Sequence, residues 1–227
     1  MYQVISYIKF LLRSTNQHGV HSPFVYNFVT KCLYDKTNYG DYTKIKTSRN
    51  EFLESNSKRG TSLKNLYLLY RISKYFKLSS TLHLGTSLGI ETLALAFGNN
   101  KNDITSILDN PEKLIWSKKN LEDLNITIIN SDFKTAISDL DQEKYDCVFF
   151  NRYHNDEAIL KHFNLLKHKA HNDSIFIFDS IYKSQSITTT WQSIIADNEV
   201  TVSIDTYNFG FVFFRKEQPK QHFTIRI

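Results

Sequence analysis

The sequence predicts an α/β protein, built on a doubly wound, mainly parallel sheet that ends in an antiparallel hairpin. From residue 62 onward, short apolar runs of strand length alternate with longer segments of helical periodicity. Such alternation is typical of right-handed crossovers and of a parallel sheet covered by helices on both faces. Near the C terminus, two strand-like runs are separated only by a hairpin-length connection around Asn208, so we expect that pair to be antiparallel.

Residues 1–61 are expected to form an N-terminal helical extension. The first segment, residues 1–17, is apolar but interrupted by Lys9 and Arg13, which favours an amphipathic helix over a signal peptide. A second helix is predicted to begin at Ser22 and Pro23, as a capping hydroxyl followed by proline. Residues 34–61 are polar with little periodicity, which predicts an irregular connection.

Residues 62–227 are expected to form the main domain, in which each element follows from its local pattern. Helices are predicted where apolar residues recur at helical spacing, at 62–76, 89–97, 111–124, 133–140, 156–170 and 186–197. Strands are predicted where apolar and β-branched residues run together, at 81–86, 103–108, 125–131, 145–150, 174–179, 200–207 and 209–216.

Composition limits the class of protein. With 227 residues, of which 41% are hydrophobic and 14% aromatic, the chain can bury one large core. Cys32 and Cys147 stand in apolar runs without metal-ligand spacing, which favours a reducing, cytoplasmic location. No apolar run is long enough to span a bilayer. The net charge of +5 is spread along the chain, which favours a solvated basic surface over a nucleic-acid interface.

The turn between the first predicted strand of the main domain and its helix is the first candidate site. Gly85 and Gly89 allow the chain to turn and to approach a ligand closely, and Thr86 and Ser87 offer hydroxyls. The glycine spacing matches neither a dinucleotide fingerprint nor a P-loop, which argues against pyrophosphate and triphosphate ligands. Taken alone, the turn fits a tight strand-to-helix connection without a ligand equally well.

Four motifs together resemble one family. They are HSPF at 21–24, LGTSLGI at 84–90, FIFD at 176–179 and the closing run GFVFFRKEQPKQHFTIRI at 210–227. With these motifs the chain resembles the class I S-adenosylmethionine-dependent methyltransferases, and more closely a bacterial O-methyltransferase-like group. The resemblance covers almost the whole chain and implies a seven-stranded, Rossmann-like sheet with an antiparallel hairpin. It also implies S-adenosylmethionine as the cofactor.

The resemblance implies a set of cofactor-binding residues. The methionine portion would lie over the glycine turn, the ribose near the end of the second strand and the adenine after the third strand. The positions concerned are Gly85, Thr86, Ser87, Gly89, Asp109, Asp132, Phe133 and Asn151. Two positions depart from the family pattern: His83 replaces an acidic residue of the first strand, and Leu108 stands where a ribose-binding carboxylate is common. Leucine cannot accept the ribose hydroxyl protons, so Asp109 would have to do so.

The candidate catalytic residues are Asp179 and His154. Asp179 closes the fifth strand at the functional edge of the sheet, although it could simply cap the segment that follows. His154 lies just past the fourth strand and could act as a general base or be an ordinary polar loop residue. Metal-dependent relatives carry an aspartate where this chain has Asn151, and an Asp-Asn or Asp-Asp pair where it has Asp179 and Ser180, so the sequence predicts no catalytic metal.

These observations predict a methyltransferase that uses S-adenosylmethionine to methylate an oxygen of a small-molecule acceptor without a metal. The alternative is a catalytically inactive protein of the same fold with a binding or interaction role. Nucleic-acid methylation is disfavoured because no Asn-Pro-Pro-Tyr-like motif of base-flipping enzymes occurs. The sequence specifies neither the acceptor nor the oligomeric state.

Overall fold

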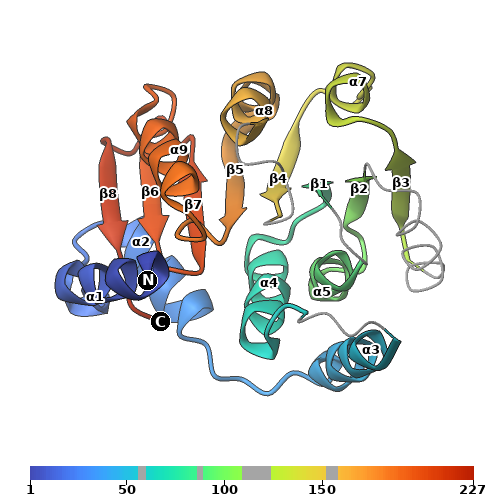
Figure 1. Cartoon of the computed structure of the whole chain (residues 1–227), viewed down its shortest axis with the longest axis horizontal. Helices are drawn as coiled ribbons and strands as arrows, with labels where there is room; N and C mark the ends of the chain where they lie inside the picture. The colour runs from blue at the N-terminus through green and yellow to red at the C-terminus, as the bar shows by residue number, and fades with distance from the viewer. Residues whose placement is uncertain (56–59, 86–88, 109–123, 152–157) are drawn as a thin grey trace.

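The computed structural model describes residues 1–55, 60–85, 89–108, 124–151 and 158–227. Its described part contains an eight-stranded sheet in the order β3-β2-β1-β4-β5-β7-β6-β8, with helices on both faces (Figure 1). The strands are β1 Ser80–Leu84, β2 Asp103–Leu108, β3 Ile126–Asn130, β4 Tyr145–Phe150, β5 Ala170–Asp179, β6 Val202–Asp205, β7 Phe209–Phe213 and β8 Gln221–Thr224. The α-helices are α1 Tyr2–Arg13, α2 Pro23–Phe28, α3 Asp41–Ser55, α4 Leu63–Phe76, α5 Ile90–Gly98, α7 Phe133–Ser138, α8 Ala158–Leu166 and α9 Gln185–Ala196.

The strand directions confirm the predicted fold class. β1 pairs in parallel with β2 and β4, β2 with β3, and β4 with β5. β7 is antiparallel to both β5 and β6, as the short connection between the last two predicted strands required. An eighth strand, β8, adds to the seven expected and pairs in parallel with β6 at the edge of the sheet. Its sequence, QHFT, is too short and polar to carry a strand pattern.

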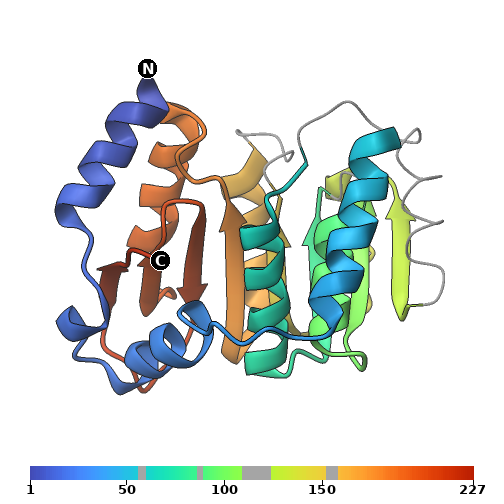
Figure 2. The same cartoon turned by 90° about the horizontal axis from the view of Figure 1, so that it is seen from below.

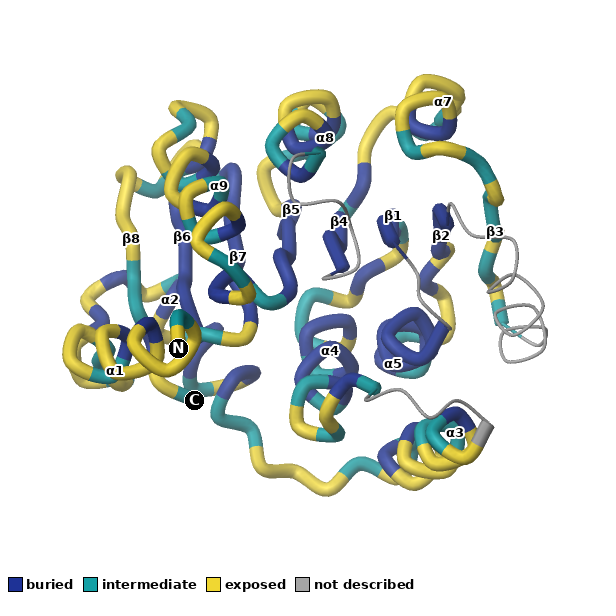
Figure 3. Tube along the Cα trace, viewed as in Figure 1, coloured by how far each residue is buried: buried dark blue, intermediate teal, exposed yellow. Residues whose placement is uncertain are grey.

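Two hydrophobic cores lie on opposite faces of the sheet because successive strand side chains point to opposite sides. In β4, Cys147 and Phe149 join the core beneath α4 and α5, whereas Val148 and Phe150 join the core beneath α8 and α9. Figure 3 shows the central strands and α5 buried, whereas α1 is mostly exposed. This double cover explains why these strands are almost continuously apolar in sequence.

The N-terminal helices begin as predicted and pack on the C-terminal strands. Ser22 Oγ accepts a hydrogen bond from the Val25 amide at 3.4 Å, and α2 continues into a π-helical turn, Val29–Leu33. The ring of Phe28 in α2 lies 5.6 Å from that of Phe211 in β7. Residues 1–61 therefore share one core with the sheet, and the domain boundary after residue 61 stays a prediction.

The prediction of an irregular connection over residues 34–61 is wrong, because α3 forms within it. Most of α3 is polar, but Tyr42, Ile45 and Phe52 are buried. The Tyr42 ring stacks on Tyr67 of α4 with centroids 3.9 Å apart. These tertiary contacts stabilise a helix that has little amphipathic pattern of its own. Figures 1 and 2 both place α3 on the side of β2 and β3, and α1 on the side of β8.

The other predicted elements are found close to their expected positions. β2 and β4 have the predicted limits, and α4 begins after Ser62, whose side chain accepts from the Asn65 amide. The helix predicted at 111–124 lies almost wholly outside the described residues. Within the described part of the chain, no helix has the length and apolar character needed to cross a membrane.

The close packing of α4 against α5 depends on Gly98. A Cβ atom at this position would collide with the Tyr70 carbonyl oxygen and approach Ser73 Cβ to 2.6 Å. We therefore expect Gly98→Ala to lower the free energy of unfolding by about 1–3 kcal/mol, as overpacked cores do. Urea denaturation measures the change. Gly40→Ala is the control, since no atom lies within 4 Å of a Cβ there, and equal destabilisation of both variants would contradict this role of Gly98.

Candidate functional site

The register of the parallel strands aligns the residues that follow them. Leu84 of β1 pairs with Phe150 of β4, and Phe150 pairs with Phe178 of β5. The carboxyl ends of these strands therefore meet at one edge of the sheet, which we call the carboxyl edge. Ligands of open α/β sheets bind at this edge. Three predicted site residues are brought side by side along it, namely Gly85, Asn151 and Asp179.

The glycine turn has the backbone conformation that its sequence predicted. Gly85 and Gly89 have φ angles of 84° and 86°, in the left-handed region that residues with a Cβ rarely adopt. The Gly85 amide donates to the Ile107 carbonyl at 3.0 Å, so the β1–β2 ladder continues to the turn. Gly89 is the N-cap of α5 and provides no side-chain cap. Backbone N–H groups at the start of α5 can therefore face a ligand.

His83 is a buried connecting residue beneath the carboxyl edge. Its Nδ1 lies 2.7 Å from Thr92 Oγ1 in α5, and its Nε2 lies 3.4 Å from Asn151 Nδ2 after β4. The ring also packs on Phe149, with centroids 4.7 Å apart. Burial lowers the pKa of His83 to about 3, so the imidazole is neutral near pH 7. His83 thus links three elements and adds no charge beneath the carboxyl edge.

Asn151 and Asp179 occupy neighbouring places on the carboxyl edge. Asn151 is buried, and its backbone amide donates to the Leu84 carbonyl at 3.0 Å. Asp179 is 5% exposed and accepts a hydrogen bond of 2.8 Å from Ser180 Oγ. Ser180 has a φ of 61°, and its amide donates to the Asn208 carbonyl at 2.6 Å. The end of β5 is therefore held against the β6–β7 hairpin.

The residues predicted to contact adenine lie farther along the edge, after β3. Asp132 caps α7, because its Oδ1 accepts from the Thr135 amide at 3.0 Å, and this hydrogen bond lowers the pKa of the carboxyl. Phe133 is half-buried, with its ring 5.7 Å from that of His162. Leu108 is buried at the end of β2. The predicted residues Thr86, Ser87, Asp109 and His154 lie outside the described residues.

Sequence reasoning missed two polar residues next to the glycine turn. Glu91, in the first turn of α5, is 1% exposed, and Thr61, just before α4, is 2% exposed. The Thr61 hydroxyl donates to Glu91 Oε1. The available signal was a single acidic residue inside the apolar run GIETLALAF, immediately after the turn.

A hollow of about 310 Å³ opens beside the end of β5, and we call it the β5 hollow. It lies between α1, the segment after β5 and the β6–β7 hairpin. The Tyr207 hydroxyl donates to the Gln3 carbonyl at 2.8 Å, which ties the hairpin to α1. The residues that line the hollow are Gln3, Ser180, Tyr182, Lys183, Tyr207 and Asn208.

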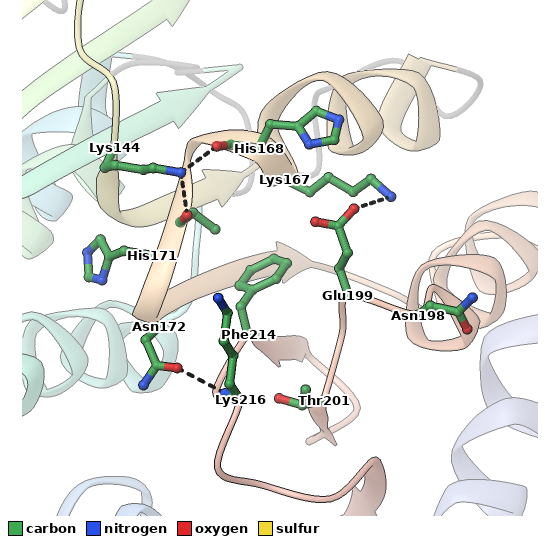
Figure 4. A pocket seen from close by; sticks show the side chains of 11 residues that line it. Lys144, Lys167, His168, His171, Asn172, Asn198, Glu199, Thr201, Phe214 and Lys216 are labelled. Carbon is green, nitrogen blue, oxygen red and sulfur yellow. Dashed lines mark hydrogen bonds and ion pairs between the residues drawn. The ribbon is translucent and has the colours of Figure 1, made fainter.

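A second hollow, of about 570 Å³, lies at the opposite edge of the sheet, where β4 and β5 begin (Figure 4). Two of its lysine side chains are engaged in structural contacts. Lys144 Nζ donates to the His168 and Ala170 carbonyls at 2.7 and 3.0 Å, and Lys167 pairs with Glu199 at 2.8 Å. This hollow is separate from the carboxyl edge, and we assign it no part in the site.

Comparison with known proteins agrees with this geometry. Residues 82–181, which run from β1 past the end of β5, match the family model of a methyltransferase domain. No curated protein sequence matches the chain.

Several solved structures share the fold at low sequence identity. The methyltransferase PaMTH1 from Podospora anserina, bound to S-adenosylhomocysteine (SAH), has a TM-score of 0.66 and 10% identity. The match covers 87% of this chain and 97% of that one. An O-methyltransferase from Bacillus cereus in complex with SAH has a TM-score of 0.63 and 13% identity, over 82% and 96%. TomG from Streptomyces achromogenes, an O-methyltransferase of tomaymycin synthesis in complex with SAM, has a TM-score of 0.62 and 13% identity, over 79% and 91%.

The buried, neutral His83 predicts a specific pH dependence of stability. The unfolded chain takes up a proton on this histidine below pH 6.5, whereas the folded chain does so only near pH 3. Its contribution is therefore fully present above pH 6.5 and is lost as the pH falls through this interval. Between about pH 7 and about pH 5, the free energy of unfolding should fall more steeply with falling pH in the wild type than in His83→Gln. The two slopes should differ by up to about 1.4 kcal/mol per pH unit. Urea denaturation at each pH measures the free energy of unfolding of both proteins. Equal slopes of that free energy against pH would contradict the prediction.

Proposed function

We propose that this chain is a methyltransferase that uses S-adenosylmethionine (SAM) to methylate an oxygen of a small-molecule acceptor, without a metal. The observation that carries the proposal is the turn between β1 and α5. It places two left-handed glycines at the carboxyl edge, within the segment that matches a methyltransferase domain. Such a turn admits a ligand to the backbone of β1 and to the N terminus of α5.

The described residues fit this cofactor. Gly85 and Gly89 form a part of the edge without side chains, against which the methionine portion of SAM would lie. Asp132 and Phe133, after β3, are the proposed contacts of the adenine. Thr86, Ser87 and Asp109 complete the proposed set on the basis of the sequence resemblance. When bound, SAM supplies a methyl group on a positively charged sulfur.

The acceptor would enter the β5 hollow, whose lining includes Ser180, the residue after Asp179. A volume of about 310 Å³ suits a small molecule, and Tyr182 and Tyr207 supply an aromatic wall with centroids 5.1 Å apart. Methyl transfer requires the attacking oxygen to be held in line with the methyl group and the sulfur. Asp179 is the proposed residue that orients a hydroxyl and accepts its proton, because it ends β5 immediately before Ser180, which lines the hollow. His154 remains the second candidate base from the sequence.

The donor groups near Asp179 support a reaction without a metal. The Asn151 amide is engaged with His83, and the Ser180 hydroxyl donates to Asp179. Asp179 is then the single carboxylate among these three positions, and neutral donors compensate poorly for the dehydration of Mg²⁺. The described residues contain no group of three or more His, Cys, Asp or Glu side chains placed to hold a metal ion.

A second function, ligand binding without catalysis, is favoured by one observation. His83 is neutral and Leu108 is buried and apolar, at positions where the resembled family carries carboxylates. Calorimetry with SAM and with its demethylated product, S-adenosylhomocysteine (SAH), tests whether the cofactor binds. SAH release with a panel of hydroxylated acceptors then separates an enzyme from a binding protein.

Replacement of Gly85 should abolish cofactor binding. Valine at a φ of 84° is strained, and its branched side chain would occupy the space that the ligand must enter. We expect folded Gly85→Val to show no measurable heat with SAH, whereas Gly40→Val, in open space before α3, should bind like the wild type. Circular dichroism verifies folding. Wild-type affinity in folded Gly85→Val would place the cofactor elsewhere.

Metal dependence can be tested and also engineered. A chelator should leave SAH affinity and any turnover unchanged, because Asp179 is the one carboxylate of its set. The paired variant Asn151→Asp with Ser180→Asn should gain Mn²⁺ binding, and asparagine tolerates the left-handed backbone at this serine. Calorimetry with Mn²⁺ measures the gain, with Ser180→Asn alone as the control. Turnover that is lost on chelation and restored by Mg²⁺ would overturn the metal-free mechanism.

A further inference from the structure

Glu91 is a buried carboxylate for which the described residues supply no countercharge. Its side chain is 1% exposed, and the sole hydrogen bond to it from the described part of the chain comes from Thr61, to Oε1. Oε2 is buried and accepts no hydrogen bond from any described residue. A neutral hydroxyl does not compensate for removing a carboxylate from water, so a group in this state normally has a cationic partner.

The position of Glu91 indicates where that partner would be. The residue lies in the first turn of α5, two positions after Gly89. Helical side chains tilt toward the N terminus of their helix, so Glu91 leans toward the glycine turn. Thr61, just before α4, engages Oε1, so Oε2 is the buried oxygen that accepts no hydrogen bond from the described residues.

Two basic side chains of α3 make contacts other than an ion pair with Glu91. Arg49 Nε donates to the Thr61 backbone carbonyl at 2.6 Å, and Lys44 Nζ lies over the Phe97 ring at 5.5 Å. The positive end of the α5 dipole favours an anion at this place, but its partial charge amounts to about half an elementary charge. The carboxylate is therefore stabilised in part and can still accept a full positive charge.

We infer that Glu91 recognises the α-ammonium group of the methionine portion of the cofactor, with Thr61 as the positioning residue that orients it. The inference rests on the proposed function, which lays the methionine portion over the same glycine turn. His83, one strand position before Leu84, does not serve this role in our proposal, because its ring nitrogens form hydrogen bonds to Thr92 and Asn151. Glu91 is thus a specificity residue for ligands that carry an amino group.

Three ligands isolate the ammonium group from the rest of the cofactor. SAH carries the amino group and the carboxylate but no sulfonium charge. Its deaminated analogue lacks the amino group alone, and its decarboxylated analogue lacks the carboxylate alone. We expect wild-type protein to bind the deaminated analogue about 10- to 100-fold more weakly than SAH, the range of a charge-assisted hydrogen bond. The decarboxylated analogue should keep the contribution of Glu91.

The variant Glu91→Gln removes the charge while its amide oxygen can still accept from Thr61. We expect it to lower the affinity for SAH by about 10- to 100-fold. The affinity for the deaminated analogue should change by less than about threefold, because that ligand has no ammonium group for Glu91 to contact. Glu199→Gln, which makes the same change at a carboxylate paired with Lys167 at the opposite edge of the sheet, is the matched control. It should leave the ratio of the two affinities as in the wild type.

The outcomes separate this inference from the proposed function. If no ligand binds wild-type protein, the proposed function fails, and the inference with it. If SAH and the deaminated analogue bind wild-type protein equally well, the role of Glu91 is refuted while the cofactor site stands. The comparison on wild-type protein decides the matter even if Glu91→Gln does not fold. If a folded Glu91→Gln loses affinity for SAH and for the deaminated analogue by the same factor, the role of Glu91 is structural instead.

Discussion

The parallel pairing of β1 with β4 is the constraint on which the rest of the site depends. It aligns Leu84 with Phe150, so that the glycine turn and Asn151 leave the sheet at the same level. A slip of one residue would turn the strand faces over, moving His83 into the opposite core and separating it from Thr92. β2 and β5 take their places from this central pair, and their ends define the remainder of the carboxyl edge.

Buried polar groups beneath that edge follow two different rules. His83 is neutral and bonded on both ring nitrogens, so it fixes the geometry of three elements without carrying charge. Glu91 carries a hydrogen bond on one oxygen and has the other unpartnered among the described residues. Native interiors normally satisfy buried polar atoms, so this unpartnered oxygen is the observation from which the role of Glu91 is inferred.

The reversed strand β7 shapes one end of the carboxyl edge. Because β7 runs antiparallel to β5, the turn between β6 and β7 reaches the carboxyl edge beside Ser180. The first helix, α1, packs on that turn through Phe10 and Tyr207, with ring centroids 5.5 Å apart. The β5 hollow is thus formed by α1 together with segments near residues 180 and 207, and its shape depends on residues that are more than 200 positions apart in the sequence, as in the Tyr207–Gln3 hydrogen bond.

The sequence by itself determined the order of most elements, the antiparallel hairpin and the glycine turn, because these follow from apolar periodicity and from the backbone freedom of Gly85 and Gly89. Only the tertiary structure decided that α3 is a helix, that β8 joins the sheet and that His83 is neutral. Helix α3 and strand β8 have weak local patterns and exist through contacts with distant partners, such as Tyr67 against Tyr42 and Thr201 against Gln221. The ionisation of His83 and the isolation of Glu91 depend on burial, which arises when distant segments pack together and remove water.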